Sequence, residues 1–203
     1  MLTFLFNIKN HYLRMAIAEL IHEVMNTSQQ TTYTLSQQWD AQGIASANII
    51  FTEMIAGEWY LCHDIFKETN ECFKLFILQS SEQDLTTSEL PNCLQTAVFI
   101  DKQTTTSTLK KEIAKAVMSC ATPSVPHSFN RLRRCINCSC RSVSEAQLRV
   151  IYAFSIGLSP HEIAAALNIS HKTIYSHKQH IMHKFKLQSQ QQFNSFIQIL
   201  ARH

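Results

Sequence analysis

The sequence predicts two domains of different fold class: an N-terminal α/β domain with a parallel sheet, residues 1–119, and a C-terminal all-α domain of four helices, residues 142–203. Three observations lead to this prediction. Short apolar runs alternate with helical spacing in the first part, helical spacing alone appears in the last part, and the net charge changes sign between the two. Residues 120–141, with Pro123, Pro126 and several serines, are expected to form a linker.

Alternating strands and helices are the pattern of the N-terminal part. Apolar runs indicate strands at 2–6, 47–54, 73–78 and 96–100, and helical spacing indicates helices at 11–25, 59–67 and 109–118. The segment 27–42 is rich in Thr, Ser and Gln, and no strand can be assigned within it. Alternation of this kind over about 120 residues is typical of a parallel sheet with crossover helices.

Capping signals divide the C-terminal part into four helices. Ser144 with Gln147, and Ser159 with Glu162, have the spacing of capping boxes, while Ser170 is an N-cap candidate. The predicted helices begin at these serines and near residue 189; the first ends near 155 and the last near 201. The third helix is basic and follows a short one after a tight turn. This is the pattern of a helix-turn-helix, whose second helix enters the DNA major groove.

Composition and charge limit the function classes. The 203 residues are 45% apolar and 16% charged, as in globular proteins, and no apolar run approaches the ~20 residues of a membrane span. The start MLTFLF lacks a basic leader and a cleavage site, so a cytoplasmic protein is expected. Residues 1–127 hold 8 Lys/Arg and 13 Asp/Glu, a net charge of −5, and residues 128–203 hold 10 and 2, a net charge of +8. The basic half suits a polyanion, although a solvated basic face gives the same count.

The third C-terminal helix separates an apolar face from a polar one. Ile174, Ile181 and Phe185 share one side and are expected in the core. The side chains outside this face can donate and accept hydrogen bonds or carry positive charge, as base edges and phosphates require. They are Lys172, Tyr175, Ser176, Gln179 and His183.

The string VSEAQLRVIYAFSIGLSPHEIAAALNISHKTIYSHKQHIMHKFKL, residues 143–187, resembles the LuxR-type (GerE, or NarL/FixJ) DNA-binding domain. The matches include Gly157-Leu158-Ser159, Glu162-Ile163-Ala164, Leu167, Ile169-Ser170, Lys172-Thr173-Ile174, His177, Ile181, Lys184 and Leu187. The resemblance implies that the third helix is the recognition helix. It implies base-reading roles for Tyr175, Ser176 and Gln179, and phosphate contacts for Lys172, Thr173, Lys178 and Lys184.

Departures from the family pattern also carry information. The family often has Lys or Arg where Tyr175 and Gln179 stand, so guanine-reading contacts are reduced, and it usually has Glu at Gln147. In this family the fourth helix often forms the dimer contact. Phe193, Phe196 and Ile197 either serve there or close the core.

The N-terminal half resembles the phosphorylatable receiver that precedes this domain in one branch of the family, a flavodoxin-like parallel sheet. The string FNIKNHYLRMAIAELIHEV is similar to its first strand end and first helix. The Mg²⁺-binding acidic pair is replaced by Ile8-Lys9, and the phosphoacceptor position holds Thr52, with Glu53 beside it. The family's lysine is present as Lys102. Because divalent metal binding and acyl-phosphate formation both need carboxylates, we expect a degenerate receiver that is not phosphorylated in the usual way.

Two further groups of residues have side chains that can ligate a metal. Cys135, Cys138 and Cys140 could bind zinc with His127 or Cys120, or sense redox state if Arg131, Arg133 and Arg134 lower a thiol pKa. No second CxxC pair exists, so a plain linker is the main interpretation and the other two stay open. His177, His180 and His183 lack Cys or carboxylate neighbours in the sequence. We therefore predict no metal and no cofactor.

The sequence thus predicts a bacterial transcription regulator that binds double-stranded DNA, independently of phosphorylation. It would act as a homodimer, or as a heterodimer with another LuxR-type regulator. The layout is similar to enterobacterial regulators of fimbriae or capsule, which implies control of surface-structure genes. The alternative is an interaction protein that heterodimerises with another regulator of the family and modulates it. An enzyme is not expected, because no nucleophile–base or metal constellation is present.

Overall fold

The computed structural model describes residues 1–27, 32–70, 73–79, 87–101, 103–121 and 138–201. The chain forms two compact units. The first comprises Met1–Met54, His63–Ser88 and Asn92–Cys138, and the second comprises Ile55–Cys62, Glu89–Pro91 and Ser139–His203. No helix in the described ranges combines the length and the hydropathy of a membrane span.

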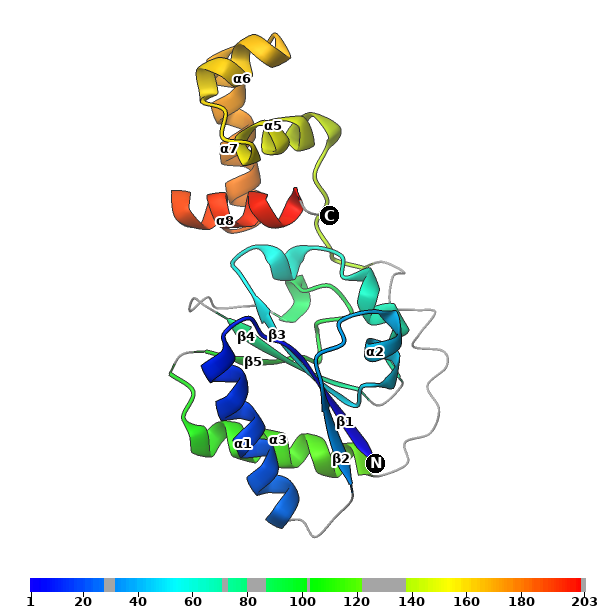
Figure 1. Cartoon of the computed structure of the whole chain (residues 1–203). Helices are drawn as coiled ribbons and strands as arrows, with labels where there is room; N and C mark the ends of the chain where they lie inside the picture. Colours follow the sequence, from blue (N-terminus) through cyan, green and yellow to red (C-terminus); the bar gives the residue numbers. More distant parts are fainter. Residues whose placement is uncertain (28–31, 71–72, 80–86, 102, 122–137, 202–203) are drawn as a thin grey trace. The chain divides into compact units, whose positions relative to one another are not determined.

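A five-stranded parallel sheet forms the centre of the first unit, in the order β2-β1-β3-β4-β5 (Figure 1). The strands are β1 (Leu2–Asn7), β2 (Tyr33–Ser36), β3 (Ile49–Met54), β4 (Lys74–Gln79) and β5 (Val98–Ile100). The central strands are buried along most of their length, which explains why they are continuous apolar runs in the sequence. The order 2-1-3-4-5 is that of flavodoxin-like sheets, in which sites form at the carboxyl ends of β1 and β3.

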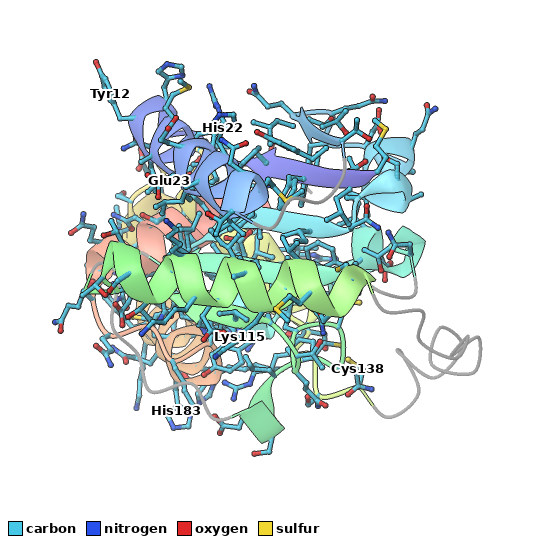
Figure 2. The ribbon with its side chains drawn as sticks, turned by 90° about the horizontal axis from the view of Figure 1, so that it is seen from below. Tyr12, His22, Glu23, Lys115, Cys138 and His183 are labelled. Carbon is cyan, nitrogen blue, oxygen red and sulfur yellow. The ribbon has the colours of Figure 1, made fainter. Side chains whose placement is uncertain are left out.

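Helices α1 (His11–Thr27) and α3 (Thr106–Ala121) lie side by side on one face of the sheet (Figure 2). Between them and the strands, Phe51 stacks on Phe6 and Phe76 at centroid distances of 5.5 and 4.7 Å. At the surface, the Lys110 ammonium lies 2.8 Å from the Glu23 carboxylate, joining the two helices. The large apolar residues buried here set the register of the sheet.

The sequence-based elements differ from the structure in the connections. The edge strand β2 was not predicted, because it is short, half-exposed and paired only with β1, so it lacks a clear alternation. Helix α2 (Ala41–Ser46), capped by Asp40, was also missed. The prediction of a helix at 59–67 was wrong: two 3-10 segments, η1 (Glu58–Tyr60) and η2 (Asp64–Glu68), are separated by extended backbone at Leu61. A third, η3 (Thr87–Glu89), precedes β5.

The second unit contains the four predicted C-terminal helices: α5 (Glu145–Ser155), α6 (Pro160–Leu167), α7 (His171–Lys184) and α8 (Gln190–Leu200). Both predicted capping boxes are present, at Ser144 with Gln147 and at Ser159 with Glu162. Gly157 has a φ of 87°, which the turn between α5 and α6 requires and which glycine adopts without a steric penalty. The predicted fold class is thereby confirmed for this part.

Candidate nucleic-acid interface

The turn between α6 and α7 is held by local hydrogen bonds and a small core. Asn168 ends α6 in the left-handed region, with a φ of 52°, and the Ile169 amide donates to the Ala164 carbonyl at 3.1 Å. Ser170 then caps α7, its hydroxyl accepting from the Thr173 amide at 3.1 Å. A helix-turn-helix geometry therefore follows from cap and turn chemistry at consecutive positions of the sequence.

The inward side of α7 is apolar and fully covered. Ile174, Ile181 and Phe185 are each 0% exposed, as their spacing in the sequence predicted. Ile174 packs in a cluster with Val150, Ile163 and Ala164, and Phe185 packs on Phe196 of α8 with ring centroids 4.5 Å apart. These contacts fix the rotation of α7 about its axis and so decide which side chains face solvent.

The opposite side of α7 is polar and exposed. Lys172, Tyr175, Ser176 and Gln179 are all exposed, and Tyr175 retains 51% of its surface despite its size. We call these four residues the recognition face. Tyr175, Ser176 and Gln179 are uncharged. Lys172 therefore supplies the positive charge of the recognition face.

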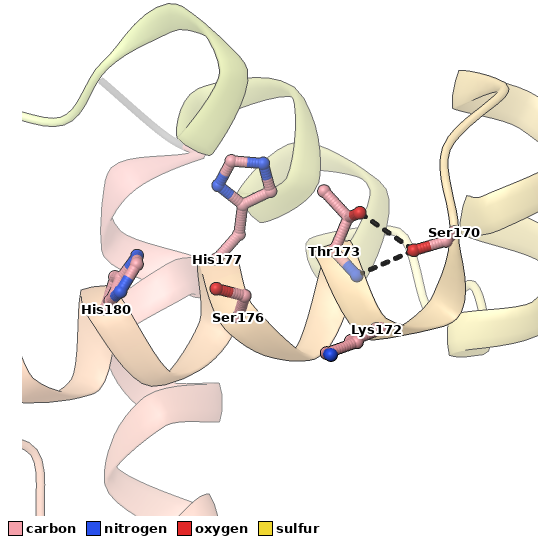
Figure 3. Close-up of a pocket in the computed structure, with 6 residues that line it drawn as sticks. All are labelled: Ser170, Lys172, Thr173, Ser176, His177 and His180. Carbon is pink, nitrogen blue, oxygen red and sulfur yellow. Dashed lines mark hydrogen bonds between the residues drawn. The ribbon is translucent and has the colours of Figure 1, made fainter.

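A shallow hollow of about 310 Å³ runs along one flank of α7 (Figure 3). Hydroxyl, ammonium and imidazole groups line it, and all can bond to phosphate or sugar oxygens. Its lining residues are Ser170, Lys172, Thr173, Ser176, His177 and His180. His180 was not among the sequence-predicted site residues. A helical-wheel projection of α7 places it near Ser176 and Thr173, and that signal was available in the sequence.

The predicted phosphate contacts divide into two groups. The Lys172 side chain is exposed, and its ammonium has no hydrogen bond or ion pair with any residue in the described ranges. Lys178, in contrast, is half-buried: its ammonium donates to the Gln190 side chain and lies 5.5 Å from the Phe193 ring centroid. The structure thus places Lys178 against α8, away from the recognition face. Thr173 is half-buried beside Ser170, with 2.8 Å between the two hydroxyl oxygens, and Lys184 is half-buried at the end of α7.

Three other cations of this unit, Lys186, Arg141 and Arg149, are paired within it. Glu89 binds the Lys186 ammonium and lies 3.8 Å from the Arg141 guanidinium, which also stacks 3.8 Å from the Tyr60 ring centroid. The hydrogen bond from Lys186 lowers the pKa of Glu89 and raises that of Lys186. Arg149 pairs with Glu145 across one turn of α5 at 2.5 Å. These partners distinguish structural cations from Lys172.

Charge at the helix N-termini distinguishes α7 from α5 and α6. The first turns of α5 and α6 carry Glu145 and Glu162. A carboxylate at this position stabilises the helix, because it lies at the positive end of the helix dipole. The pKa of Glu162 is lowered, first by the side-chain hydrogen bond from Ser159. The first turn of α7 has no acidic residue and carries Lys172 instead. The helix dipole does not favour a cation at this end of the helix.

The receiver-like site lies at the carboxyl ends of β1 and β3. Thr52 is 2% exposed, and its hydroxyl accepts from the Asn7 side-chain amide at 3.1 Å. Ile8 is buried, and the Lys9 amide donates to the Glu53 carboxylate at 2.9 Å. Glu53 therefore places a carboxylate at this end of the two strands, and this carboxylate accepts a hydrogen bond from the Lys9 backbone amide. Lys102 lies outside the described residues.

The cysteine group is only partly described. Cys135, His127 and the arginines at 131, 133 and 134 lie outside the described residues. Cys138 is half-buried, and its sulfur accepts from the Asn92 amide at 3.4 Å. Within the described ranges, no three His, Cys, Asp or Glu side chains are grouped as a metal site.

Comparison with known proteins identifies the C-terminal domain. Residues 141–196 match the family model of bacterial regulatory proteins of the luxR family, so the predicted LuxR-type resemblance is confirmed for this segment. The segment is less than a third of the chain. A comparison with curated proteins gave no match.

Among solved structures, the chain is similar in fold to RcsB. For two RcsB dimers bound to two parallel DNAs, the identity is 17% over 100% of this chain and 99% of that chain, with a TM-score of 0.52. For RcsB from Salmonella enterica serovar Typhimurium bound to promoter P1flhDC in the presence of phosphomimetic BeF3⁻, it is 18% over 98% of each chain, with a TM-score of 0.56. A five-stranded parallel sheet domain followed by a luxR-type helical domain is the shared fold, as the sequence predicted.

Proposed function

We propose that this chain is a transcription regulator that binds double-stranded DNA by placing α7 in the major groove. The observation that carries the proposal is the recognition face, an exposed polar stripe opposite a fully buried apolar one on the second helix of a helix-turn-helix. Ser176 and Gln179 would read base edges, Tyr175 would add hydrogen bonding and stacking, and Lys172 would bind phosphate. The flank with Thr173, His177 and His180 would add backbone contacts.

We further propose that the regulator works without phosphorylation of its receiver-like domain. The support is chemical: Thr52 offers a hydroxyl with low acidity in place of a carboxylate nucleophile. Ile8 and Lys9 offer no oxygen ligands for Mg²⁺. Control would then come from the amount of protein or from a partner, in a homodimer or a heterodimer with another LuxR-type regulator. The fold likeness to RcsB supports dimers, and surface-structure genes remain our proposed targets.

The interaction-protein alternative is favoured by one observation. Tyr175 and Gln179 supply no charge where the family often has Lys or Arg, so sequence reading by this chain alone is weakened. A partner regulator with a complete recognition helix would then contribute the missing base contacts. Under this alternative, the recognition face adds affinity without setting the site.

The test begins with duplexes selected from a random pool by the full chain. The triple variant Lys172→Ala, Tyr175→Ala, Gln179→Ala should lose at least roughly a hundredfold in affinity for the selected duplex, because each contact contributes about 1–3 kcal/mol. Lys111→Ala, an exposed lysine of α3, removes the same charge and should leave binding unchanged. Unchanged binding of the triple variant would refute the proposal. Failure to select any sequence, together with co-purification of a second luxR-type regulator, would support the alternative.

A further inference from the structure

Two imidazole rings meet at the start of the two helices of the helix-turn-helix. The Nδ1 atom of His161 lies 2.9 Å from the Nε2 atom of His171, and the ring centroids are 5.0 Å apart. His161 is in the first turn of α6, and His171 is the first residue of α7. Both side chains are exposed, so the outer side of the pair is open to solvent.

We propose that His161 and His171 form a binding site for a divalent late transition-metal ion such as Zn²⁺, Ni²⁺ or Cu²⁺. Imidazole nitrogens bind such ions at roughly 2.0–2.1 Å, so two ligands at right or tetrahedral angles lie about 3 Å apart. The observed 2.9 Å separation already matches this requirement. The two nitrogens are now within hydrogen-bond distance of each other, and rotation of both rings would turn their lone pairs toward one point on the exposed side.

The backbone beneath the pair is rigid, which favours chelation over single-ligand binding. Ser159 and Glu162 hold the start of α6 in a capping box, and Ser170 holds the start of α7. Ile163 and Ile174, two residues beyond His161 and three beyond His171, are both fully buried in one core cluster. The two rings are therefore presented together by folding, and little entropy is lost when an ion joins them.

The ligands that the pair offers decide which metal ions it can bind. The nearest carboxylate in the sequence, Glu162, is engaged by the Ser159 amide and hydroxyl, each at 2.7 Å. Two nitrogens with water completing the shell suit Cu²⁺, Ni²⁺ and Zn²⁺, and they do not suit Mg²⁺ or Ca²⁺, which prefer carboxylate oxygens.

Binding would cross-link α6 and α7 and add positive charge at the start of the recognition helix. Any effect on DNA affinity rests on the proposed function, whereas metal binding itself does not. The prediction of no metal rested on the cysteine group and on His177, His180 and His183. His161 and His171, which are ten residues apart and belong to different helices, did not enter it. Only the turn at Asn168 and Ile169 brings them together.

The experiment uses the full chain and Zn²⁺ alone, without DNA. In long-range ¹H–¹⁵N spectra of the histidine rings, the signals of His161 and His171 should shift together and saturate at micromolar Zn²⁺. The melting temperature of the domain should rise by a few degrees, because an ion that binds only the folded state stabilises it. His161→Ala and His171→Ala should each abolish both responses.

His180→Ala is the matched control, because it removes an exposed imidazole from the same helix and should leave both responses intact. The exposed positions make all three variants compatible with folding. Ring signals of His161 and His171 that do not move below millimolar Zn²⁺ would overturn the proposal, as would an equal response in His171→Ala. A positive result with no DNA affinity would separate this site from the proposed function.

Discussion

The two units of this chain differ in whether the fold is accompanied by the polar residues that its proposed function needs. In the second unit, α7 presents Lys172 and Gln179 to solvent on a helix whose other side is fully buried, so fold and polar face are both present. In the first unit, the sheet order is that of a flavodoxin-like domain, and Thr52, Ile8 and Lys9 occupy the positions at which we expect a phosphorylatable receiver to carry carboxylates. A parallel sheet is specified by many apolar positions, and phosphoacceptor chemistry by a few polar ones. The fold can therefore be retained while the residues at these few positions change.

Core substitutions should give the largest effects and show whether the two parts unfold separately. Phe51→Ala removes a ring stacked on Phe6 and Phe76 and should cost about 3–5 kcal/mol of stability, while Ile174→Ala should cost about 2–5 kcal/mol. Urea unfolding followed by circular dichroism and by DNA binding measures both. If the parts are independent, Phe51→Ala should leave the DNA-binding transition in place. A common shift of both transitions would contradict that independence.

Restoring the carboxylate at the receiver-like site should not restore its chemistry. Thr52→Asp places a charge at a position that is 2% exposed, in place of a hydroxyl that accepts from Asn7, and should destabilise the sheet domain by roughly 1–3 kcal/mol. Incubation with acetyl phosphate and Mg²⁺, followed by intact mass measurement, should show no added phosphate, because Ile8 and Lys9 cannot bind the metal. A stoichiometric phosphate adduct in this variant would show that the site retains more function than we infer.

The two lysines of α7 should differ in their effect on salt dependence. Lys172→Ala should reduce the slope of log affinity against log salt by about 0.9, the value for one lost phosphate contact. Lys178→Ala should leave the slope nearly unchanged, because that ammonium is bound to Gln190 and lies over Phe193. Fluorescence anisotropy across a salt series measures both. If both variants show the same slope of log affinity against log salt, Lys172 and Lys178 do not differ in phosphate contact, which contradicts this prediction.

The smallest expected effect is a pH dependence confined to one helix cap. The folded-state pKa of Glu162 lies below its ordinary value because Ser159 donates to it, so its stabilising contribution is complete above that ordinary value. It is lost as pH falls through the lowered folded-state pKa. Glu162→Gln should flatten this part of the stability curve, since Gln147 fills the same role in α5 without titrating. Thermal melts between about pH 5 and 2 compare the two proteins, and an unchanged curve in the variant would assign the pH dependence elsewhere.

Much of the fold and of the site could be predicted from local pattern. Capping boxes at Ser144 and Ser159 placed helix starts correctly, and the 3.6-residue spacing of Ile174 and Ile181 placed the buried side of α7. The edge strand β2 was not predicted, because its half-exposed residues lack the apolar side that a buried strand shows in its sequence. The segment 59–67 was misjudged as one helix because Trp59 and Tyr60 are adjacent apolar residues held by 3-10 turns, not by helical periodicity.

The sequence by itself determined the fold class of each part, the helix caps, and the absence of carboxylates at Ile8, Lys9 and Thr52. These depend on residue identity and on neighbours within a few positions, where spacing alone carries the physics. Only the tertiary structure decided that Lys178 turns to α8 while Lys172 stays exposed, and that His161 meets His171. Such outcomes depend on how helices are rotated and packed against one another, and the spacing within one helix does not specify that.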